Sequence, residues 1–429
     1  MKKSICIIGL GYIGLPTAVM FSNHGHVVHG VDVNESVVEH IRNKKLHIEE
    51  NGLQERLDKA IDSNAFTVST TPVKADVFII AVPSPIKADK TANLEYIRSA
   101  AKAITPFVEE GNLVILESTV PPRTVQDVII PELLQSGLEI GTDIFVSHSP
   151  ERVIPGRAFE ELVSNDRIIG GVNPASARMT SELYRSFVKG QMHETDDITA
   201  ELVKVMENTY RDVNIALANE LAKIAQTIDV NIWEAIRLAN YHPRVELHQP
   251  GPGVGGHCIA VDPWFLVELN PELAQIIHLA RRTNDGMPEY TAQLTADILK
   301  AQGVEQPKVA ALGLAFKGNI DDMRESPSVD VVKQMELKNL NVVAYDPHIK
   351  TNNINEQTQD AEKAFDGASA IVILTSHDEF KALEPEKVAV SMAHKIIIDT
   401  KNCIDRNKWE KAGFQVYVLG DSKNSKPLV

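Results

Sequence analysis

The chain contains little cysteine, few aromatic residues, no C-x-x-C pair and no long apolar run. Its 429 residues include three cysteines, and aromatic residues make up 5% of the total. Cys6, Cys258 and Cys403 are far apart and odd in number, so neither a disulfide framework nor a zinc motif is expected. We therefore expect a protein of the reducing cytoplasm without a bound metal ion.

Positive charge is also scarce. Lys and Arg number 43 against 58 Asp and Glu, which gives a formal net charge of −15. Because nucleic-acid binding requires clustered cations, this balance argues against a nucleic-acid partner. An anionic small ligand must instead be bound by a few cations that the fold gathers locally.

The apolar runs are shorter than the roughly 18 residues that a membrane helix needs, so we expect no contact with a membrane. The basic start Met1-Lys2-Lys3 and the apolar run after it resemble a secretory signal. That run, however, contains a glycine loop and is followed by Asp32 at the spacing typical of a nucleotide-binding fold. We therefore interpret it as part of the folded protein and expect a cytoplasmic location.

The order of β-rich and helical segments predicts the fold class. In the first and last thirds, short β-rich runs alternate with helical segments, which predicts an α/β protein with two Rossmann-like doubly wound parallel-sheet domains. The runs are 4–8, 26–33, 77–82, 113–117 and 144–147, then 308–312, 342–345, 370–374 and 395–399. Between them, residues 198–229 lack Gly and Pro and predict a long central helix of about 45 Å that joins the domains. The expected domains are 1–195, 196–300 and 301–429.

A glycine loop follows the first predicted strand. In Gly9-x-Gly11-x-x-Gly14, the first glycine permits a tight turn, the second admits a pyrophosphate, and the third lets the helix pack on the strand. Asp32 lies 18 residues after Gly14, at the end of the next strand, where a carboxylate binds a ribose 2′-hydroxyl and repels a 2′-phosphate. The pattern predicts NAD rather than NADP. An FAD site and an ordinary glycine turn remain alternatives.

The segment 249–263 places four glycines directly before Cys258. Such a loop lets the backbone approach a ligand and favours an accessible thiol. A thiol beside a nicotinamide can add to an aldehyde and give a thiohemiacetal from which a second hydride leaves. The alternative is that Cys258 is a buried small apolar residue, the commonest state of a free cysteine. Cys6 and Cys403 have no comparable setting and are expected to be structural.

Other polar residues stand at positions typical of ligand binding. Lys204 and Asn208 are four residues apart in the central helix, so they share one face and can present an ammonium group and an amide to one oxygen. A solvated helix face is the alternative interpretation. The segments 117–119 and 149–152 follow predicted strands, whose carboxyl ends bind ligands in open α/β sheets.

Taken in order, these motifs resemble those of the UDP-glucose/GDP-mannose dehydrogenase family, and the resemblance covers essentially the whole chain. The matching blocks are Gly9-x-Gly11-x-x-Gly14, Glu117-Ser118-Thr119, Ser149-Pro150-Glu151-Arg152, Lys204-x-x-x-Asn208, Gly255-Gly256-x-Cys258-x-x-x-Asp262 and Phe316-Lys317-x-x-x-Asp321-Asp322-x-Arg324-x-Ser326-Pro327. The resemblance implies an NAD-dependent enzyme that oxidises the C6 alcohol of a UDP-sugar to a carboxylate in two hydride transfers, with the aldehyde stage held on the enzyme. It assigns NAD binding to 1–195, dimerisation and the cysteine loop to 196–300, and UDP-sugar binding to 301–429.

The resemblance also implies roles for individual residues. The implied catalytic residues are the nucleophile Cys258, the base Asp262, the oxyanion-stabilising Lys204 and Asn208, the water-orienting Glu151, and Thr119 beside the nicotinamide. The implied cofactor-binding residues are Gly9, Gly11, Tyr12, Ile13, Gly14, Asp32, Pro83, Ser84, Thr119 and Arg324. The implied substrate-binding residues are Glu151, Arg152, Lys204, Asn208, His242, Arg244, Gly255, Lys317 and Arg324.

Four of these positions carry further implications. Ser84 stands where threonine is common in the family, and its hydroxyl preserves the contact with the cofactor. Arg324 resembles a residue that bridges sugar and cofactor, and Lys317 one near the UDP moiety. Arg244 resembles an arginine that reaches the substrate of the neighbouring subunit, which implies a homodimer around the central helix. Such cations explain how an acidic chain can bind a pyrophosphate.

A few side chains bear on the identity of the sugar. The blocks 151–157 and 165–171 and the segment 242–245 resemble the N-acetylmannosamine branch of the family. His257 stands where UDP-glucose dehydrogenases usually carry an aromatic or other residue, and Ala260-Val261 replaces their Pro-Lys pair. We therefore expect oxidation of UDP-N-acetylmannosamine to UDP-N-acetylmannosaminuronate, as a precursor of a surface polysaccharide. UDP-N-acetylglucosamine is the next candidate, and UDP-glucose follows it.

Two interpretations from other classes stay open at this point. One is a catalytically silent nucleotide-sugar-binding protein on the same fold, against which the joint presence of Cys258, Lys204, Asn208 and Asp262 argues. The other is a monomeric hydroxyacid dehydrogenase that uses only the first domain. It predicts neither a dimer nor affinity for UDP.

Overall fold

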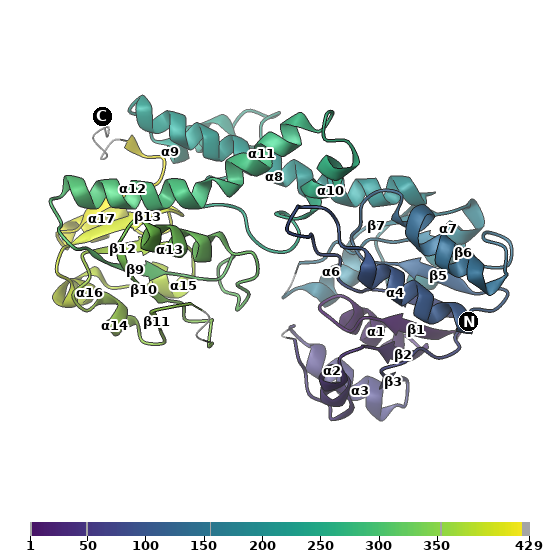
Figure 1. Ribbon diagram of the computed structural model, residues 1–429. Helices are drawn as coiled ribbons and strands as arrows, with labels where there is room; N and C mark the ends of the chain where they lie inside the picture. Colours follow the sequence, from purple (N-terminus) through teal and green to yellow (C-terminus); the bar gives the residue numbers. More distant parts are fainter. Residues whose placement is uncertain (1, 49, 155, 352–353, 423–429) are drawn as a thin grey trace. The chain divides into compact units, whose positions relative to one another are not determined.

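The computed structural model describes residues 2–48, 50–154, 156–351 and 354–422 (Figure 1). The chain separates into two compact units. Unit 1 is Met1–Glu207 with Trp264–Leu269, and unit 2 is Asn208–Pro263 with Asn270–Val429. The division falls inside the long helix α8 (Asp197–Thr227), so the three domains 1–195, 196–300 and 301–429 stay a prediction. Among the described residues, no helix is both long enough and apolar enough to cross a membrane.

Unit 1 is built on an eight-stranded sheet in the order β3-β2-β1-β4-β5-β6-β7-β8. Its strands are β1 (Ser4–Ile8), β2 (Val27–Val31), β3 (Phe66–Ser69), β4 (Val77–Ile80), β5 (Leu113–Leu116), β6 (Phe145–His148), β7 (Arg167–Gly171) and β8 (Met192–Asp196). Its helices are α1 (Gly14–Asn23), α2 (Glu35–Arg42), α3 (Leu53–Asp62), α4 (Glu95–Ile104), α5 (Ile130–Leu133), α6 (Ala158–Ser164) and α7 (Pro174–Tyr184), with single turns at Thr105–Phe107, Val125–Ile129 and Leu134–Ser136.

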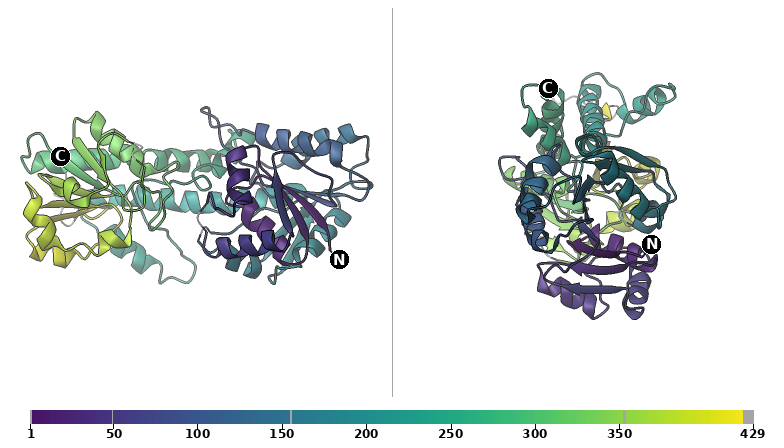
Figure 2. Two further views of the ribbon diagram at one scale, coloured as in Figure 1. Left: turned by 90° about the horizontal axis from the view of Figure 1, so that it is seen from below. Right: turned by 90° about the vertical axis from the view of Figure 1, so that its right-hand side faces the viewer.

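Alternate side chains of each inner strand bury two separate cores. In β1, Ile5 and Ile7 pack with residues of α1 and α3, while Cys6 and Ile8 pack with residues of α4 and α5. Because both faces are covered, an inner strand such as β4 is buried along its whole length and appears in the sequence as a continuous apolar run. Helices on both faces of the sheet confirm the predicted doubly wound α/β architecture (Figure 2).

Strands β7 and β8 were not predicted from the sequence. The first six strands are parallel, but β7 runs antiparallel to β6 and β8 is parallel to β7. The sheet is therefore mixed at this edge. The reversal has a structural consequence, because the first residue of an antiparallel strand lies next to the last residues of its neighbour. Arg167, which begins β7, is thereby placed near the carboxyl end of β6.

Unit 2 contains a six-stranded parallel sheet in the order β11-β10-β9-β12-β13-β14. Its strands are β9 (Lys308–Leu312), β10 (Asn341–Tyr345), β11 (Gln357–Thr358), β12 (Ala370–Ile373), β13 (Ile396–Asp399) and β14 (Gln415–Val418). Its helices are α9 (Ile232–Ala239), α11 (Gln275–Asp285), α12 (Met287–Ala301), α13 (Pro327–Leu337), α14 (Ala361–Phe365), α15 (Asp378–Lys381), α16 (Pro385–Ser391) and α17 (Arg406–Lys411). Helices α8 and α10 (Asp262–Leu269) belong partly to each unit. The second predicted sheet and the long helix are confirmed.

A buried carboxylate organises the loop after β9. Asp346, which follows β10, has no exposed surface and accepts backbone N–H groups of Leu314 and Ala315 at 2.6 and 2.9 Å. It also accepts the N–H of His348 at 2.8 Å and lies 3.0 Å from Nε2 of His377. Burial alone would raise the pKa of Asp346, but the hydrogen bonds from His377 and the backbone lower it to about 2.

We predict that Asp346→Asn destabilises the protein by about 3 kcal/mol, because an amide cannot accept all of these donors and leaves buried N–H groups unsatisfied. Chemical denaturation at pH 7 checks this. Asp330→Asn, which removes an exposed ion pair with Lys333, is the control and should cost less than about 0.5 kcal/mol. The pKa of Asp346 in the folded protein is below its ordinary value of 3.8. The difference in free energy of unfolding between the wild type and Asp346→Asn should therefore be largest at neutral pH and shrink as the pH falls through 3.8 toward 2. A stability difference between the two proteins that grows as the pH falls would contradict this account.

Candidate active site

In the glycine loop between β1 and α1, one glycine has space around it for a side chain and the other two do not. Gly9 has a φ of +95°, and a Cβ on it would lie 2.6 Å from the carbonyl oxygen of Ala81. A Cβ on Gly14 would lie 1.9 Å from the carbonyl oxygen of Gly9. Around Gly11, by contrast, a Cβ would meet nothing within 4 Å. Packing inside the chain therefore requires the outer glycines, and the middle one leaves space for a ligand.

Asp32 lies beside this loop, at the end of β2. Its carboxylate accepts the N–H of Leu10 at 3.1 Å and that of Asn34 at 2.9 Å. His47, which the sequence analysis missed, hydrogen-bonds through Nε2 to the carbonyl oxygen of Leu10 at 2.8 Å. A carboxylate is thus fixed at the loop, in the place where the sequence predicts a ribose contact.

The loops after β4 and β5 are joined to each other. Ser84 donates its hydroxyl hydrogen to the carbonyl oxygen of Thr119, and Ser118 donates to the carbonyl oxygen of Val82 at 2.6 Å. The carboxyl ends of the parallel strands β1, β4 and β5 lie at one edge of the sheet. The predicted cofactor residues Pro83, Ser84 and Thr119 therefore follow strands that end at the same edge as the glycine loop.

The loop after β6 carries Glu151 and Arg152. One carboxylate oxygen of Glu151 accepts the N–H of Arg152 at 2.6 Å, and the other accepts from Arg167 at 3.0 Å. The Arg152 side chain pairs with Glu207 of α8 at 2.6 Å. Pro155, part of the block 151–157, lies outside the described residues.

In unit 2, the glycines of the cysteine loop pack directly on the segment 316–327. A Cβ on Gly253 or Gly255 would lie 2.7 or 2.5 Å from the ring of Pro327, and one on Gly256 would lie 2.9 Å from Phe316. The loop is also held by α8, because Asn219 accepts the N–H of Gly251 at 2.9 Å. Close packing within the chain therefore accounts for these glycines, whereas the sequence analysis attributed them to ligand approach.

Cys258 is only half-buried, so the interpretation as a fully buried apolar residue is wrong. Its carbonyl oxygen accepts the N–H of Asp262, the first residue of α10, at 2.9 Å. The Asp262 carboxylate is buried and accepts the side-chain amide of Asn208 at 2.6 Å. Lys204 stands one helical turn before Asn208 on α8. The structure therefore brings Asn208, Asp262 and Cys258 together through two hydrogen bonds.

The basic residues predicted to bind the substrate in unit 2 are exposed. Lys317 and Arg324 are exposed, and the Arg324 guanidinium pairs with Asp322 at 2.6 Å. His242 and Arg244 are exposed in the turn after α9, where the N–H of Arg244 donates to Nδ1 of His242 at 3.3 Å. These four residues lie at the surface of unit 2.

One further cation was missed. The ammonium group of Lys401, just after β13, lies 3.0 Å from the position that a Cβ on Gly251 would occupy. Burial lowers the pKa of this lysine. Its place directly after a predicted strand, at the ligand-binding edge of an open sheet, was a signal that the sequence analysis did not use.

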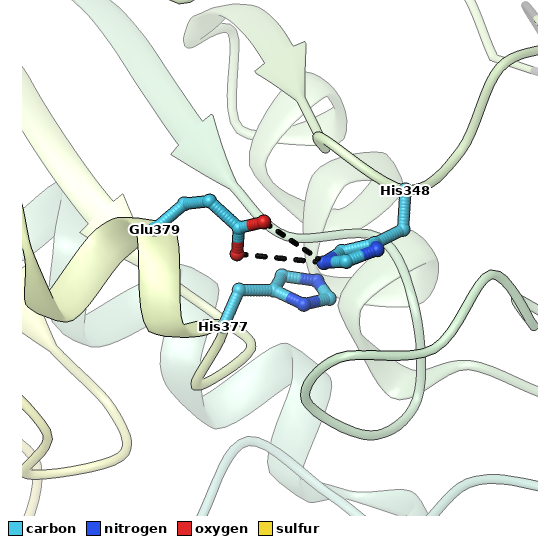
Figure 3. A group of neighbouring side chains, drawn as sticks. All are labelled: His348, His377 and Glu379. Carbon is cyan, nitrogen blue, oxygen red and sulfur yellow. Dashed lines mark hydrogen bonds and ion pairs between the residues drawn. The ribbon is translucent and has the colours of Figure 1, made fainter. Parts of the chain in front are cut away.

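A polar cluster in unit 2 consists of His348, His377 and Glu379 (Figure 3). Their ligand-type atoms lie within 4.8 Å of one another. His377, however, accepts the N–H of Asn319 at Nδ1, 2.9 Å away, and faces Asp346 with Nε2. Nε2 must then carry the hydrogen, so both ring nitrogens are engaged and neither offers a lone pair to a metal ion. The cluster stabilises the loops after β10 and β12.

Three models of one protein family match the chain. They are the NAD binding domain, the central domain and the UDP binding domain of the UDP-glucose/GDP-mannose dehydrogenase family, at residues 3–188, 198–286 and 310–406. Since all three match, the interpretation as a hydroxyacid dehydrogenase confined to the first domain is wrong.

Individual relatives agree over almost the full length. A UDP-N-acetyl-D-mannosamine dehydrogenase of Methanococcus maripaludis is 49% identical over 426 residues, which cover 98% of this chain and 97% of the relative. The solved UDP-D-ManNAc dehydrogenase of Pyrococcus horikoshii is 42% identical, with a TM-score of 0.91 over 98% of this chain and 100% of that one. A UDP-N-acetyl-mannosamine dehydrogenase of Staphylococcus aureus is 44% identical, with a TM-score of 0.90 over 98% and 99% of the two chains. The resemblance inferred from the motifs is confirmed, and the chain belongs to the UDP-glucose/GDP-mannose dehydrogenase family.

Proposed function

We propose that the protein oxidises UDP-N-acetylmannosamine at C6 to UDP-N-acetylmannosaminuronate, with two molecules of NAD as oxidant. The observation that carries the proposal is that the half-buried Cys258 accepts, at its backbone carbonyl, the N–H of Asp262, whose carboxylate is hydrogen-bonded to Asn208. The near full-length similarity to UDP-N-acetylmannosamine dehydrogenases supports the choice of sugar. The product would be a precursor of a surface polysaccharide, made in the cytoplasm.

The chemistry has three stages. The glycine loop would hold one NAD for each oxidation step, and each NAD would supply a two-electron oxidant that takes one hydride from C6, first at the alcohol level and then, after NADH has been replaced by a second NAD, at the aldehyde level. Between these transfers, the thiol of Cys258 adds to the C6 aldehyde and forms a thiohemiacetal, which loses the second hydride to become a thioester. Water then cleaves the thioester to the carboxylate and the free thiol. The thiol must be accessible for this sequence, and it is half-buried rather than enclosed.

The residues around Cys258 fit the charge changes at C6. An alkoxide develops in the first step and a tetrahedral oxyanion in the last, and both require fixed donors. Lys204 supplies an ammonium group, and Asn208 retains a second amide hydrogen after donating one to Asp262. Asp262, held by that bond, is oriented to accept a proton from water. The family resemblance assigns the orientation of water to Glu151 and the nicotinamide site to Thr119.

UDP binding is assigned to the cations of unit 2. Lys317, Arg324 and the newly identified Lys401 lie in segments that pack with the cysteine loop or follow strands of the second sheet. They supply positive charge for a diphosphate in a chain whose net charge is −15. Gly255 lets the backbone of the cysteine loop pack on Pro327, and His242 and Arg244 stay available for a neighbouring subunit.

The sugar assignment is tested by measuring NADH formation with the purified protein and UDP-N-acetylmannosamine, UDP-N-acetylglucosamine or UDP-glucose. We expect UDP-N-acetylmannosamine to have the highest kcat/KM, and UDP-glucose, whose branch carries a Pro-Lys pair at the place of Ala260-Val261, to have the lowest. Turnover of UDP-glucose alone would contradict the assignment.

We predict that Gly11→Ala weakens NAD binding at least tenfold and leaves the melting temperature unchanged. The open space around Gly11 accepts a methyl group in the free protein, but that methyl group occupies the approach of the pyrophosphate. Isothermal titration with NAD and thermal unfolding measure the two quantities. Gly14→Ala is the contrasting variant and should destabilise the fold itself, because its Cβ meets the Gly9 carbonyl. Unchanged NAD affinity in Gly11→Ala would exclude the loop as the pyrophosphate site.

A homodimer is proposed from an apolar stripe on α8. Tyr210, Leu217 and Ile224 are 45% to 55% exposed and recur at intervals of seven residues, so they share one helix face. On α11, Ile276 and Leu279 are 74% and 60% exposed. Large apolar side chains in such a row are typical of an interface between subunits. This dimer would let Arg244 reach the neighbouring active site.

We expect sedimentation of the wild-type chain at twice its 47.2 kDa mass. The double variant Leu217→Glu, Ile224→Glu should sediment as a monomer, because association would bury two unpaired carboxylates from each subunit at a cost on the order of several kcal/mol. Glu220→Gln, an exposed change on the same helix, is the control and should remain dimeric. A monomeric wild type, or a double variant that still dimerises, would refute the proposed interface.

A further inference from the structure

Unit 1 contains a buried ionic cluster in which Glu151 has an assigned role and the residues around it have none. We call it the Arg167 cluster; it comprises Glu117, Ser149, Glu151, Arg167 and Tyr184. Its members come from the end of β5, the end of β6, the start of β7 and the end of α7. The reversed direction of β7 places Arg167 beside the loop that carries Glu151.

The Arg167 guanidinium is held by three separate partners. Nε donates to the hydroxyl of Ser149 at 2.8 Å, Nη2 to Glu117 at 2.6 Å and Nη1 to Glu151 at 3.0 Å. Its carbon Cζ also lies 3.9 Å from the centre of the Tyr184 ring. The side chain is 5% exposed. Because the guanidinium is planar and bound on every edge, it cannot turn without breaking a buried hydrogen bond.

The charges in the cluster are unevenly distributed. Glu117 has no exposed side-chain surface and accepts hydrogen bonds from Arg167 and from the Tyr184 hydroxyl, the latter at 2.5 Å. Burial raises the pKa of Glu117 to about 7, so a proton readily neutralises it. His148, buried at the end of β6, stays uncharged because burial lowers its pKa to about 3. Arg167 therefore lies between two carboxylates, of which Glu117 is partly protonated near neutral pH.

Glu151 is held at both of its oxygens. Oε1 accepts the N–H of Arg152 at 2.6 Å, and Oε2 accepts Nη1 of Arg167. The side chain of Arg152 is itself fixed by its ion pair with Glu207. Each carboxylate oxygen has a second lone pair, so the carboxylate can still accept a hydrogen bond from water. Its direction is determined by Arg167.

We propose that Arg167 is a positioning residue, which fixes the direction of the Glu151 carboxylate for the water-orienting role that the proposed function gives to Glu151. The inference rests on the proposed function, in which Glu151 orients the water that cleaves the thioester. In this step the water oxygen bonds to the acyl carbon and the carbon–sulfur bond breaks, with its electron pair returning to the sulfur of Cys258. Asp262 accepts the proton that the water loses, the released thiolate takes up a proton, and no group is oxidised or reduced. Glu117, Ser149 and Tyr184 fix Arg167 and do not touch the substrate.

A double-mutant cycle tests the proposal. Arg167→Lys keeps the charge but cannot reach three partners, so we expect kcat for NADH formation to fall about ten- to a hundredfold, with little change in KM for the UDP-sugar. Glu151→Gln should lower kcat at least as much. If Arg167 acts through Glu151, adding Arg167→Lys to Glu151→Gln should change kcat by less than about twofold. Multiplicative losses would show an independent structural effect and overturn the proposal.

The matched control is Tyr184→Phe. It removes the hydroxyl bonded to Glu117 in the same buried cluster but leaves the bond between Arg167 and Glu151, so kcat at pH 7.5 should stay within about twofold of the wild type. If Arg167→Lys fails to fold, Ser149→Ala replaces it. That variant deletes one bond to the guanidinium, and a severalfold loss of kcat that disappears in the Glu151→Gln background is expected. Equal kcat losses in Tyr184→Phe and Ser149→Ala would overturn the proposal.

The outcomes also separate this inference from the proposed function. Wild-type kcat in Glu151→Gln would remove the role of Glu151, and the role of Arg167 with it, while leaving Cys258 and the UDP-sugar in place. Failure of the wild-type protein to oxidise UDP-N-acetylmannosamine would instead overturn the proposed substrate. The cycle would then be measured with the sugar that is oxidised, and the same comparison of single and double variants would decide the role of Arg167.

Discussion

In the first sheet, β1, β4, β5 and β6 run parallel, so their carboxyl ends lie along one edge. The loops that leave this edge carry the glycine loop, Ser84, Thr119 and Glu151. Because backbone hydrogen bonds fix the register of the strands, the places at which these loops begin are fixed as well. The antiparallel β7 adds Arg167 to the same edge from the opposite direction. The arrangement of the polar groups therefore follows from the direction and order of the strands.

Much of the fold was predictable because buried parallel strands appear in the sequence as short continuous apolar runs. The runs 4–8 and 308–312 coincide with β1 and β9, since both are apolar and end at glycine turns. In contrast, β8 has exposed and half-buried residues throughout its sequence Met-His-Glu-Thr-Asp, so no apolar run marks it. β7 includes two glycines, which are unfavourable in strands, and it was likewise missed. Both depend on pairing with distant strands.

The candidate site was predictable as a set of motifs but not as a set of contacts. Cys258, Asp262 and Asn208 were each identified from spacing, but the hydrogen bond between Asn208 and Asp262 joins residues 54 positions apart. Arg167 belonged to a block used only to compare sugars, and its three buried partners come from three other segments. Lys401 was overlooked because its neighbour Gly251 is distant in sequence. Such pairings arise from tertiary structure.

The three cysteines show how environment decides chemistry. Cys6 is fully buried between the first sheet and helices α4 and α5, and burial raises its pKa to about 11. Cys403 lies against Asp399, and burial raises its pKa to about 12. Both therefore remain thiols at neutral pH, as expected of structural residues. Cys258 alone stands in a glycine loop beside a carboxylate–amide pair, and the proposed four-electron oxidation depends on it.

The central claim is that one cofactor site serves two oxidation steps through Cys258. The most direct measurement is the number of NADH molecules formed per molecule of UDP-N-acetylmannosamine consumed, with limiting sugar and excess NAD. The account predicts two for the wild-type protein, with the C6 carboxylate as product, and fewer than two for Cys258→Ser. One NADH per sugar for the wild type, or two for Cys258→Ser, would contradict it.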